Sequence, residues 1–219
     1  MTSLTPQEEE NLANRRRSSD SVENYFKSNT KEIDPETGRN VIKIFAGGWH
    51  VSGASDNEML STILGSCISA CIRDPMLRVG GMNHFLLPGD DTMNAHAYDA
   101  ARYGVFAMET LINEILKFGG RKNRLEVKVF GGGNVTSHSS KIGTKNANFV
   151  RHFLGEEGIK IVSEDLEGDL PRRVHYYPDT GKVMIRKLRR KEDMAVVAEE
   201  ARYSKSITSK PVEGDIDLF

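Results

Sequence analysis

Residues 60–88 read LSTILGSCISACIRDPMLRVGGMNHFLLP. Two runs of β-prone residues flank Asp74 and Pro75, and an aspartate followed by a proline is typical of the first two positions of a type I turn. Two apolar runs around such a turn predict an antiparallel β-hairpin.

The predicted hairpin brings a thiol and an imidazole together. A four-residue loop pairs Arg73 with Arg78, and counting outward from that pair places Cys67 opposite His84. Residues directly opposite each other on antiparallel strands have Cβ atoms roughly 4.5 to 5.5 Å apart, which suits a thiolate–imidazolium pair. A bulge at residues 80–81 would turn His84 to the other face of the hairpin. The facing pair therefore depends on this register.

The chain has only two cysteines, Cys67 and Cys71, and both lie in the first strand of the predicted hairpin. Residues four apart in an extended strand are about 13 Å from each other, so these thiols can neither form a disulfide nor bind one metal as a pair. None of the six histidines forms a recognised zinc spacing with them, and we expect no metal and no cofactor. An intracellular cysteine is more often a small packed hydrophobe, which is the role expected for Cys71.

The composition excludes several classes of protein. The formal net charge is −1, and the basic residues are scattered except near the ends of the chain, a pattern unlike that of nucleic-acid-binding proteins. The N-terminus lacks the apolar core of a signal peptide, and no later run approaches the ~20 apolar residues of a membrane span. Two cysteines also fit a reducing compartment. We therefore expect a soluble, cytoplasmic protein.

Three segments are expected along the chain. Residues 1–40 form a polar, mobile extension, residues 41–187 form one domain, and residues 188–219 form a charged C-terminal tail. Within the domain, the spacing of apolar residues predicts helices over 98–118 and 146–154, strands over 40–45 and 125–130, and a hairpin around 178–181. This irregular mixture of hairpins with two helices indicates an α+β fold.

The sequence LGSC at residues 64–67, followed by GGMNHFLLP at residues 80–88, resembles the CheD family of chemoreceptor glutamine deamidases. The resemblance covers roughly residues 41–187. It continues through RYG at 102–104, AME at 107–109, FGGG at 130–133, IG at 142–143 with Asn146, and TGK at 180–182.

This resemblance implies a fold and a catalytic set. The fold is a layered β/β/α sandwich akin to the catalytic domain of cytotoxic necrotizing factor toxins, and the catalytic set is Cys-His-Thr. Cys67 and His84 match the first two members directly. The third position, six residues before the cysteine, is Ser61 in this chain, with Thr62 beside it. Either hydroxyl can be the one that orients the histidine, and we expect Ser61.

The resemblance also implies an activity and partners. The expected activity is hydrolysis of glutamine side chains to glutamate on the cytoplasmic helices of chemoreceptors, which tunes chemotaxis signalling. A CheC-type phosphatase is a further expected partner, and the enzyme is expected to associate with receptor arrays. Two alternatives stay open: a non-catalytic adaptor that binds receptors or such a phosphatase, and a redox sensor that uses Cys67.

Overall fold

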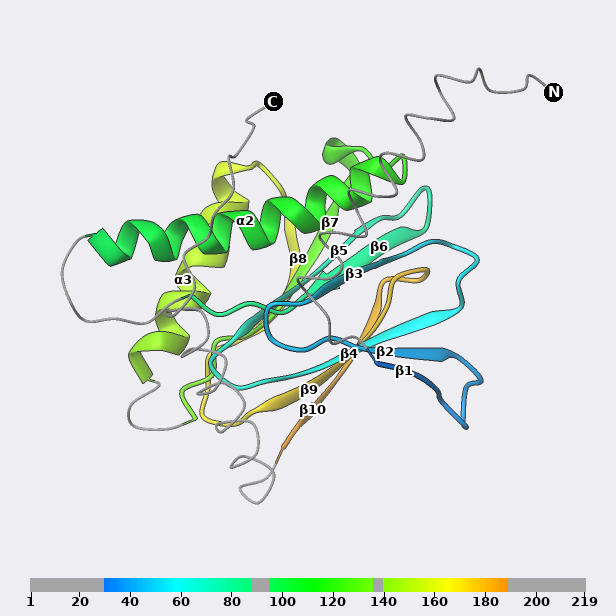
Figure 1. Ribbon diagram of the computed structural model, residues 1–219, viewed down its shortest axis with the longest axis horizontal. Coiled ribbons are helices and arrows are strands. Elements are labelled where there is room, and N and C mark those ends of the chain that lie inside the picture. Colours follow the sequence, from blue (N-terminus) through cyan, green and yellow to red (C-terminus); the bar gives the residue numbers. More distant parts are fainter. Residues whose placement is uncertain (1–29, 88–94, 136–139, 189–219) are drawn as a thin grey trace.

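The computed structural model describes residues 30–87, 95–135 and 140–188 of the chain (Figure 1). In chain order, the elements of these residues are β1 (Thr30–Ile33), β2 (Asn40–Lys43), β3 (Trp49–Ser52), β4 (Glu58–Leu64), β5 (Ile68–Asp74), β6 (Val79–Asn83), α2 (Ala95–Lys117), the short 3₁₀ helix η1 (Lys122–Arg124), β7 (Glu126–Gly131), α3 (Ser140–Glu156), β8 (Ile161–Leu166), β9 (Arg172–Tyr177) and β10 (Lys182–Lys187).

The strands form two sheets that lie one above the other. The first sheet has the order β1-β2-β4-β9-β10, and the second has the order β3-β6-β5-β7-β8. Helices α2 and α3 cover the face of the second sheet that points away from the first (Figure 1). The structure therefore confirms a mixed fold with two sheets and few helices, and it also contains the predicted β5–β6 and β9–β10 hairpins.

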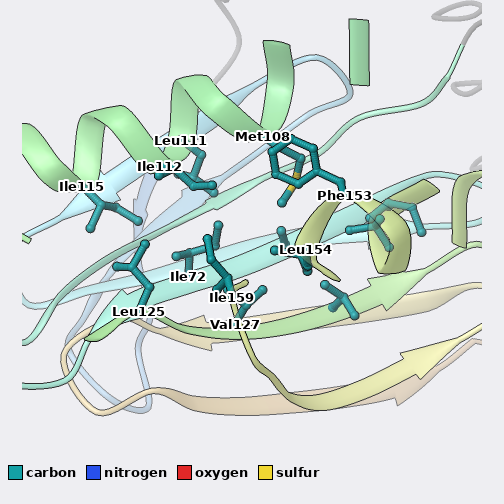
Figure 2. Packing of buried hydrophobic residues seen from close by; sticks show 14 of the residues in the cluster. Ile72, Met108, Leu111, Ile112, Ile115, Leu125, Val127, Phe153, Leu154 and Ile159 are labelled. Carbon is teal, nitrogen blue, oxygen red and sulfur yellow. The ribbon is translucent and has the colours of Figure 1, made fainter. Parts of the chain in front are cut away.

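Two apolar layers hold these elements together. Between the helices and the second sheet, α2 contributes Met108, Leu111, Ile112 and Ile115, which point toward Ile72 and Val127 of the sheet (Figure 2). This packing confirms the helix predicted over 98–118. The other layer lies between the two sheets and contains Cys67, Cys71, Leu60, Leu64, Met82, Val174 and Tyr176. Strand β5 is thus buried on both faces, because alternate side chains enter alternate layers.

The register of the β5–β6 hairpin differs from the prediction by two residues. Asp74 pairs with Val79 and Cys71 pairs with Met82, and an isolated bridge at the far end pairs Ile68 with Phe85. The prediction that Cys67 lies directly opposite His84 is therefore wrong.

The turn explains this difference in register. The Asp74 carboxylate accepts hydrogen bonds from the backbone N–H groups of Met76 (3.0 Å) and Leu77 (3.3 Å), and Arg78 has a φ of 56°. Asp74 is therefore the last residue of β5, and the left-handed Arg78 belongs to the loop. A shift of two residues keeps every side chain on its face of the hairpin.

The first sheet extends beyond the predicted domain boundary. Residues 30–40, which the composition assigned to the extension, include β1, and β1 pairs with β2 in antiparallel register. At the other end, Leu188 is buried, and its N–H donates to the Pro171 carbonyl (2.8 Å). Residues 1–29 and 189–219, the rest of the predicted extension and tail, lie outside the described residues.

Asp74 joins the β5–β6 turn to the segment that follows α2. Its fully buried carboxylate accepts hydrogen bonds from the Arg121 N–H (3.0 Å) and from the Arg124 guanidinium (Nε, 2.8 Å). Burial raises the pKa of Asp74. Hydrogen bonds from the Arg124 guanidinium and from the N–H groups of Arg121, Leu77 and Met76 lower it by more than burial raises it, so the net pKa lies below its ordinary value. The ionised form is therefore the one that stabilises the fold.

We expect Asp74→Asn to lower the free energy of unfolding at pH 7 by about 1 to 3 kcal/mol, because buried donors lose their charged acceptor. A carboxylate whose pKa is depressed by folding stabilises the folded protein at pH values above its pKa in the unfolded chain, about 3.9. This contribution is lost as the pH falls through its pKa in the folded protein. The difference between variant and wild type should therefore shrink at pH 3. Urea unfolding at both pH values measures it, and an equal difference at both would contradict this account.

Candidate active site

The loop that carries Cys67 runs from the end of β4 to the start of β5 and is held by three hydrogen bonds to its consecutive carbonyl groups. The Gly65 carbonyl accepts from the Gly133 N–H (2.7 Å), and the Cys67 carbonyl accepts from the Gly132 N–H (2.8 Å). The Ser66 carbonyl between them accepts from the Asn146 side chain (2.8 Å). Cys67 itself is fully buried.

The glycine-rich segment after β7 passes too close to this loop for any side chain. A Cβ atom on Gly131 would lie 2.0 Å from the Cys67 carbonyl oxygen. Its φ of 109° is also one that glycine adopts without strain. The FGGG sequence is therefore a packing feature that lets two backbones meet.

His84 follows β6 and is buried between the two sheets. Its N–H donates to the Gly48 carbonyl (2.9 Å), and its carbonyl accepts from the Gly47 N–H (2.7 Å). Cys67 and His84 immediately precede Ile68 and Phe85, which exchange two backbone hydrogen bonds (2.8 and 2.9 Å). The predicted thiol and imidazole therefore lie next to the two ends of one isolated bridge between the chain segments, in a diagonal and not a direct pairing.

The Thr62 hydroxyl determines which nitrogen of His84 carries the proton. It donates to the Ile44 carbonyl (2.7 Å) and lies 2.8 Å from His84 Nδ1. A hydroxyl has one hydrogen, and a carbonyl can only accept. Thr62 must therefore accept from Nδ1–H, which assigns the lone pair of the neutral ring to Nε2 and leaves that nitrogen able to take a proton.

Ser61 does not occupy the place predicted for it. Successive residues of a strand point to opposite faces, and Ser61 lies opposite His175 in the β4–β9 register, whereas Thr62 lies opposite the buried Val174. Thr62 faces the layer between the sheets, and Ser61 faces the other side of the first sheet. The expectation that Ser61 contacts His84 is therefore wrong.

Cys71 is a packed thiol, as predicted. It is buried between the sheets, and burial raises its pKa, an effect that the Ser69 hydroxyl and Lys128 only partly offset. Both cysteines are free thiols. Within the described residues, no group of three or more histidine, cysteine or acidic side chains is placed to hold a metal ion.

A small hollow beside His84 was not predicted from the sequence. It lies between α2 and the turn that leads into β3, and its lining residues are Gly47, Gly48, Trp49, Asn83, His84, Tyr103, Phe106, Ala107 and Thr110. The adjacent glycines at 47 and 48 were the available signal, because paired glycines after a strand often mark a close approach of two backbones. Tyr103 and Ala107 belong to the RYG and AME motifs.

We expect iodoacetamide at neutral pH to label Cys67 roughly tenfold or more faster than Cys71, because the thiolate is the reactive form: both thiols are buried, but Cys67 has the imidazole of His84 as a neighbour, whereas burial raises the pKa of Cys71. Peptide mapping of the labelled protein measures both rates. Cys71→Ser should leave the labelling of Cys67 unchanged and serves as the control. Faster labelling of Cys71 would show that the assignment of the reactive thiol is wrong.

Comparisons with known proteins agree with the motifs. The family model described as CheD chemotactic sensory transduction matches residues 86–187. A protein of Hydrogenovibrio crunogenus is 48% identical over 191 residues, which span 86% of this chain and 99% of that protein. A Rhodopseudomonas palustris protein is 51% identical over 191 residues, spanning 85% and 87%. Both relatives are named probable chemoreceptor glutamine deamidase CheD.

Two further findings concern the structure. A crystal structure of a Neisseria meningitidis protein of family model DUF152 aligns with a TM-score of 0.37 at 10% identity, covering 70% of this chain and 68% of that one, a likeness too weak to define the fold family. Among the helices of the described residues, none is long and apolar enough to cross a membrane. Because the chain is 48% and 51% identical to these two relatives over 191 aligned residues, which span most of each protein, it belongs to the CheD family.

Proposed function

We propose that this chain hydrolyses glutamine side chains on the cytoplasmic helices of chemoreceptors to glutamates, with Cys67 as nucleophile, His84 as base and Thr62 as the residue that orients His84. The names of the relatives support the substrate. The observation that carries the chemistry is the hydrogen bond between Thr62 and His84 Nδ1 (2.8 Å), because it leaves Nε2 as the basic nitrogen. A buried imidazole oriented in this way beside a cysteine is the arrangement that activates a thiol.

The reaction needs a stronger nucleophile than water, because a carboxamide is a poor electrophile. His84 takes the proton of the Cys67 thiol, and the thiolate attacks the side-chain carbonyl carbon of glutamine. His84 then gives this proton to the leaving nitrogen, ammonia departs, and a thioester remains. A water molecule deprotonated by His84 attacks the thioester, which restores the thiol and leaves glutamate.

The tetrahedral intermediate also needs hydrogen-bond donors for its oxyanion. The backbone around Ser66 and Cys67 is the proposed source, because the carbonyls of this loop are held by Gly133, Asn146 and Gly132. Donors whose direction is fixed before the reaction do not have to reorganise during it.

The proposed product adds a negative charge to a receptor helix. The change alters the charge balance where signalling helices pack side by side, and receptor output shifts with it. Such a substrate places the enzyme in the cytoplasm, at receptor arrays. A CheC-type phosphatase is proposed as a second partner, and the layered sheets as a relative of the cytotoxic necrotizing factor catalytic domain.

We expect wild-type protein to convert receptor glutamines to glutamates, detected by peptide mass spectrometry of purified receptor cytoplasmic fragments and by ammonia release. Cys67→Ala should abolish both signals. His84→Ala should lower the rate by about 10² to 10⁴, the usual contribution of a general acid–base residue, while receptor binding persists. Binding without conversion by the wild-type protein would instead identify a non-catalytic adaptor.

The orienting hydroxyl has a test of its own. Thr62→Val keeps the shape of the side chain but removes both hydrogen bonds, and we expect it to lower kcat at least roughly tenfold, because the ring of His84 loses its orientation. Thr62→Ser keeps the hydroxyl and should retain most activity. Ser61→Ala is the matched control on the neighbouring residue and should leave kcat unchanged. A damaging Ser61→Ala with a harmless Thr62→Val would reverse the assignment.

A further inference from the structure

One buried amide side chain contacts both halves of the candidate active site. Asn146 lies in α3 and is fully buried. Its Nδ2 donates to the carbonyl of Ser66 (2.8 Å), and its Oδ1 accepts from the N–H of Leu87 (3.0 Å). Ser66 immediately precedes Cys67, and Leu87 lies three residues after His84. A single planar group therefore joins the loop of the nucleophile to the segment of the base.

The contact with Ser66 completes a set of three. The consecutive carbonyls of Gly65, Ser66 and Cys67 all accept hydrogen bonds, the outer two from backbone N–H groups of the glycine-rich segment. Asn146 supplies the middle one and is the only side chain among the three donors. A substitution of Asn146 can therefore remove the hydrogen bond to Ser66 while the two backbone donors stay in place.

The position of α3 against the glycine-rich segment keeps Asn146 in place. Gly143 lies one turn before Asn146, and a Cβ atom there would be 2.6 Å from the carbonyl oxygens of both Gly132 and Gly133. The helix thus packs directly against the segment that binds the outer two carbonyls. All three contacts therefore come from two segments that pack directly against each other.

Holding the Ser66 carbonyl has a consequence for the peptide that leads into Cys67. In a planar trans peptide, the C=O and the N–H point in opposite directions. When the Ser66 carbonyl points at Asn146, the Cys67 N–H points away from α3. This peptide carries one of the N–H groups proposed above to face the oxyanion, and its direction depends on the Asn146 amide.

We propose that Asn146 is a positioning residue, which orients the Ser66–Cys67 peptide for stabilisation of the oxyanion and holds it in register with the segment that bears His84. This inference rests on the proposed function. Asn146 acts through the backbone and makes no contact with the reacting atoms, so its removal lowers kcat more than it changes KM.

The substitution Asn146→Asp separates this role from simple packing. The ionised carboxylate still accepts from Leu87 but has no hydrogen for the Ser66 carbonyl, whereas the protonated acid restores both hydrogen bonds. Burial raises the pKa of such a carboxyl group. We expect kcat to be reduced roughly 10²-fold at pH 8, and the deficit relative to wild type to shrink as the pH falls toward 6.

Two comparisons complete the experiment, which measures ammonia release from receptor fragments and the melting temperature of each variant. Asn146→Ala should show the loss of kcat at every pH, because alanine cannot regain the hydrogen bond. Val150→Ala, a fully buried core truncation one turn further along α3, should lower the melting temperature while keeping kcat within roughly threefold of wild type.

The outcomes distinguish the two hypotheses. No ammonia from wild-type protein rejects the proposed function. With an active wild type, a deficit of Asn146→Asp that stays constant with pH, or an Asn146→Ala that retains kcat, overturns the positioning role alone. Loss of cooperative melting in both Asn146 variants also overturns it, because the residue then serves the fold and not the reaction.

Discussion

The backbone pair of Ile68 and Phe85 determines how the two halves of the candidate site meet. Its two hydrogen bonds join the end of the cysteine loop to the residue after His84. At the other end of the same hairpin, the buried carboxylate of Asp74 holds the turn against the segment after α2. Because a strand pair has one register along its whole length, a slip at either end would separate the thiol from the imidazole.

A neutral hydroxyl orients the histidine in this structure. In a serine-protease triad, a buried carboxylate holds the imidazole in its tautomer. Here Thr62 holds it without a charge, because the Ile44 carbonyl takes the only hydrogen of the hydroxyl. His84 lies between two sheets lined by apolar side chains, where an additional carboxylate would be costly to bury. The hydroxyl therefore sets the tautomer at little cost in desolvation.

The local pattern of the chain was sufficient to predict most of the elements. Period-two and helical spacings identify strands and helices wherever one face is buried, and these predicted α2, the β9–β10 hairpin and the α+β class. Cys67 and His84 flank one turn signature, but the resemblance of their motifs to the CheD family is what selected them as candidate catalytic residues. Asn146 belonged to a recognised motif, but its contacts with Ser66 and Leu87 join segments 80 and 59 residues away, which no local pattern encodes.

The sequence by itself therefore determined the classes of the elements, because these follow from spacings within a few residues, and the family resemblance singled out Cys67 and His84 as the candidate thiol and imidazole. Only the tertiary structure decided the hairpin register and the orienting hydroxyl. Asp74 and Pro75 are compatible with a loop that begins at either residue, and the carboxylate that caps the observed turn at Met76 and Leu77 is also held by Arg121 and Arg124, 47 and 50 positions later. Ser61 and Thr62 both lie on buried faces of β4, so polarity could not distinguish them. Which face meets His84 depends on how the two sheets stack.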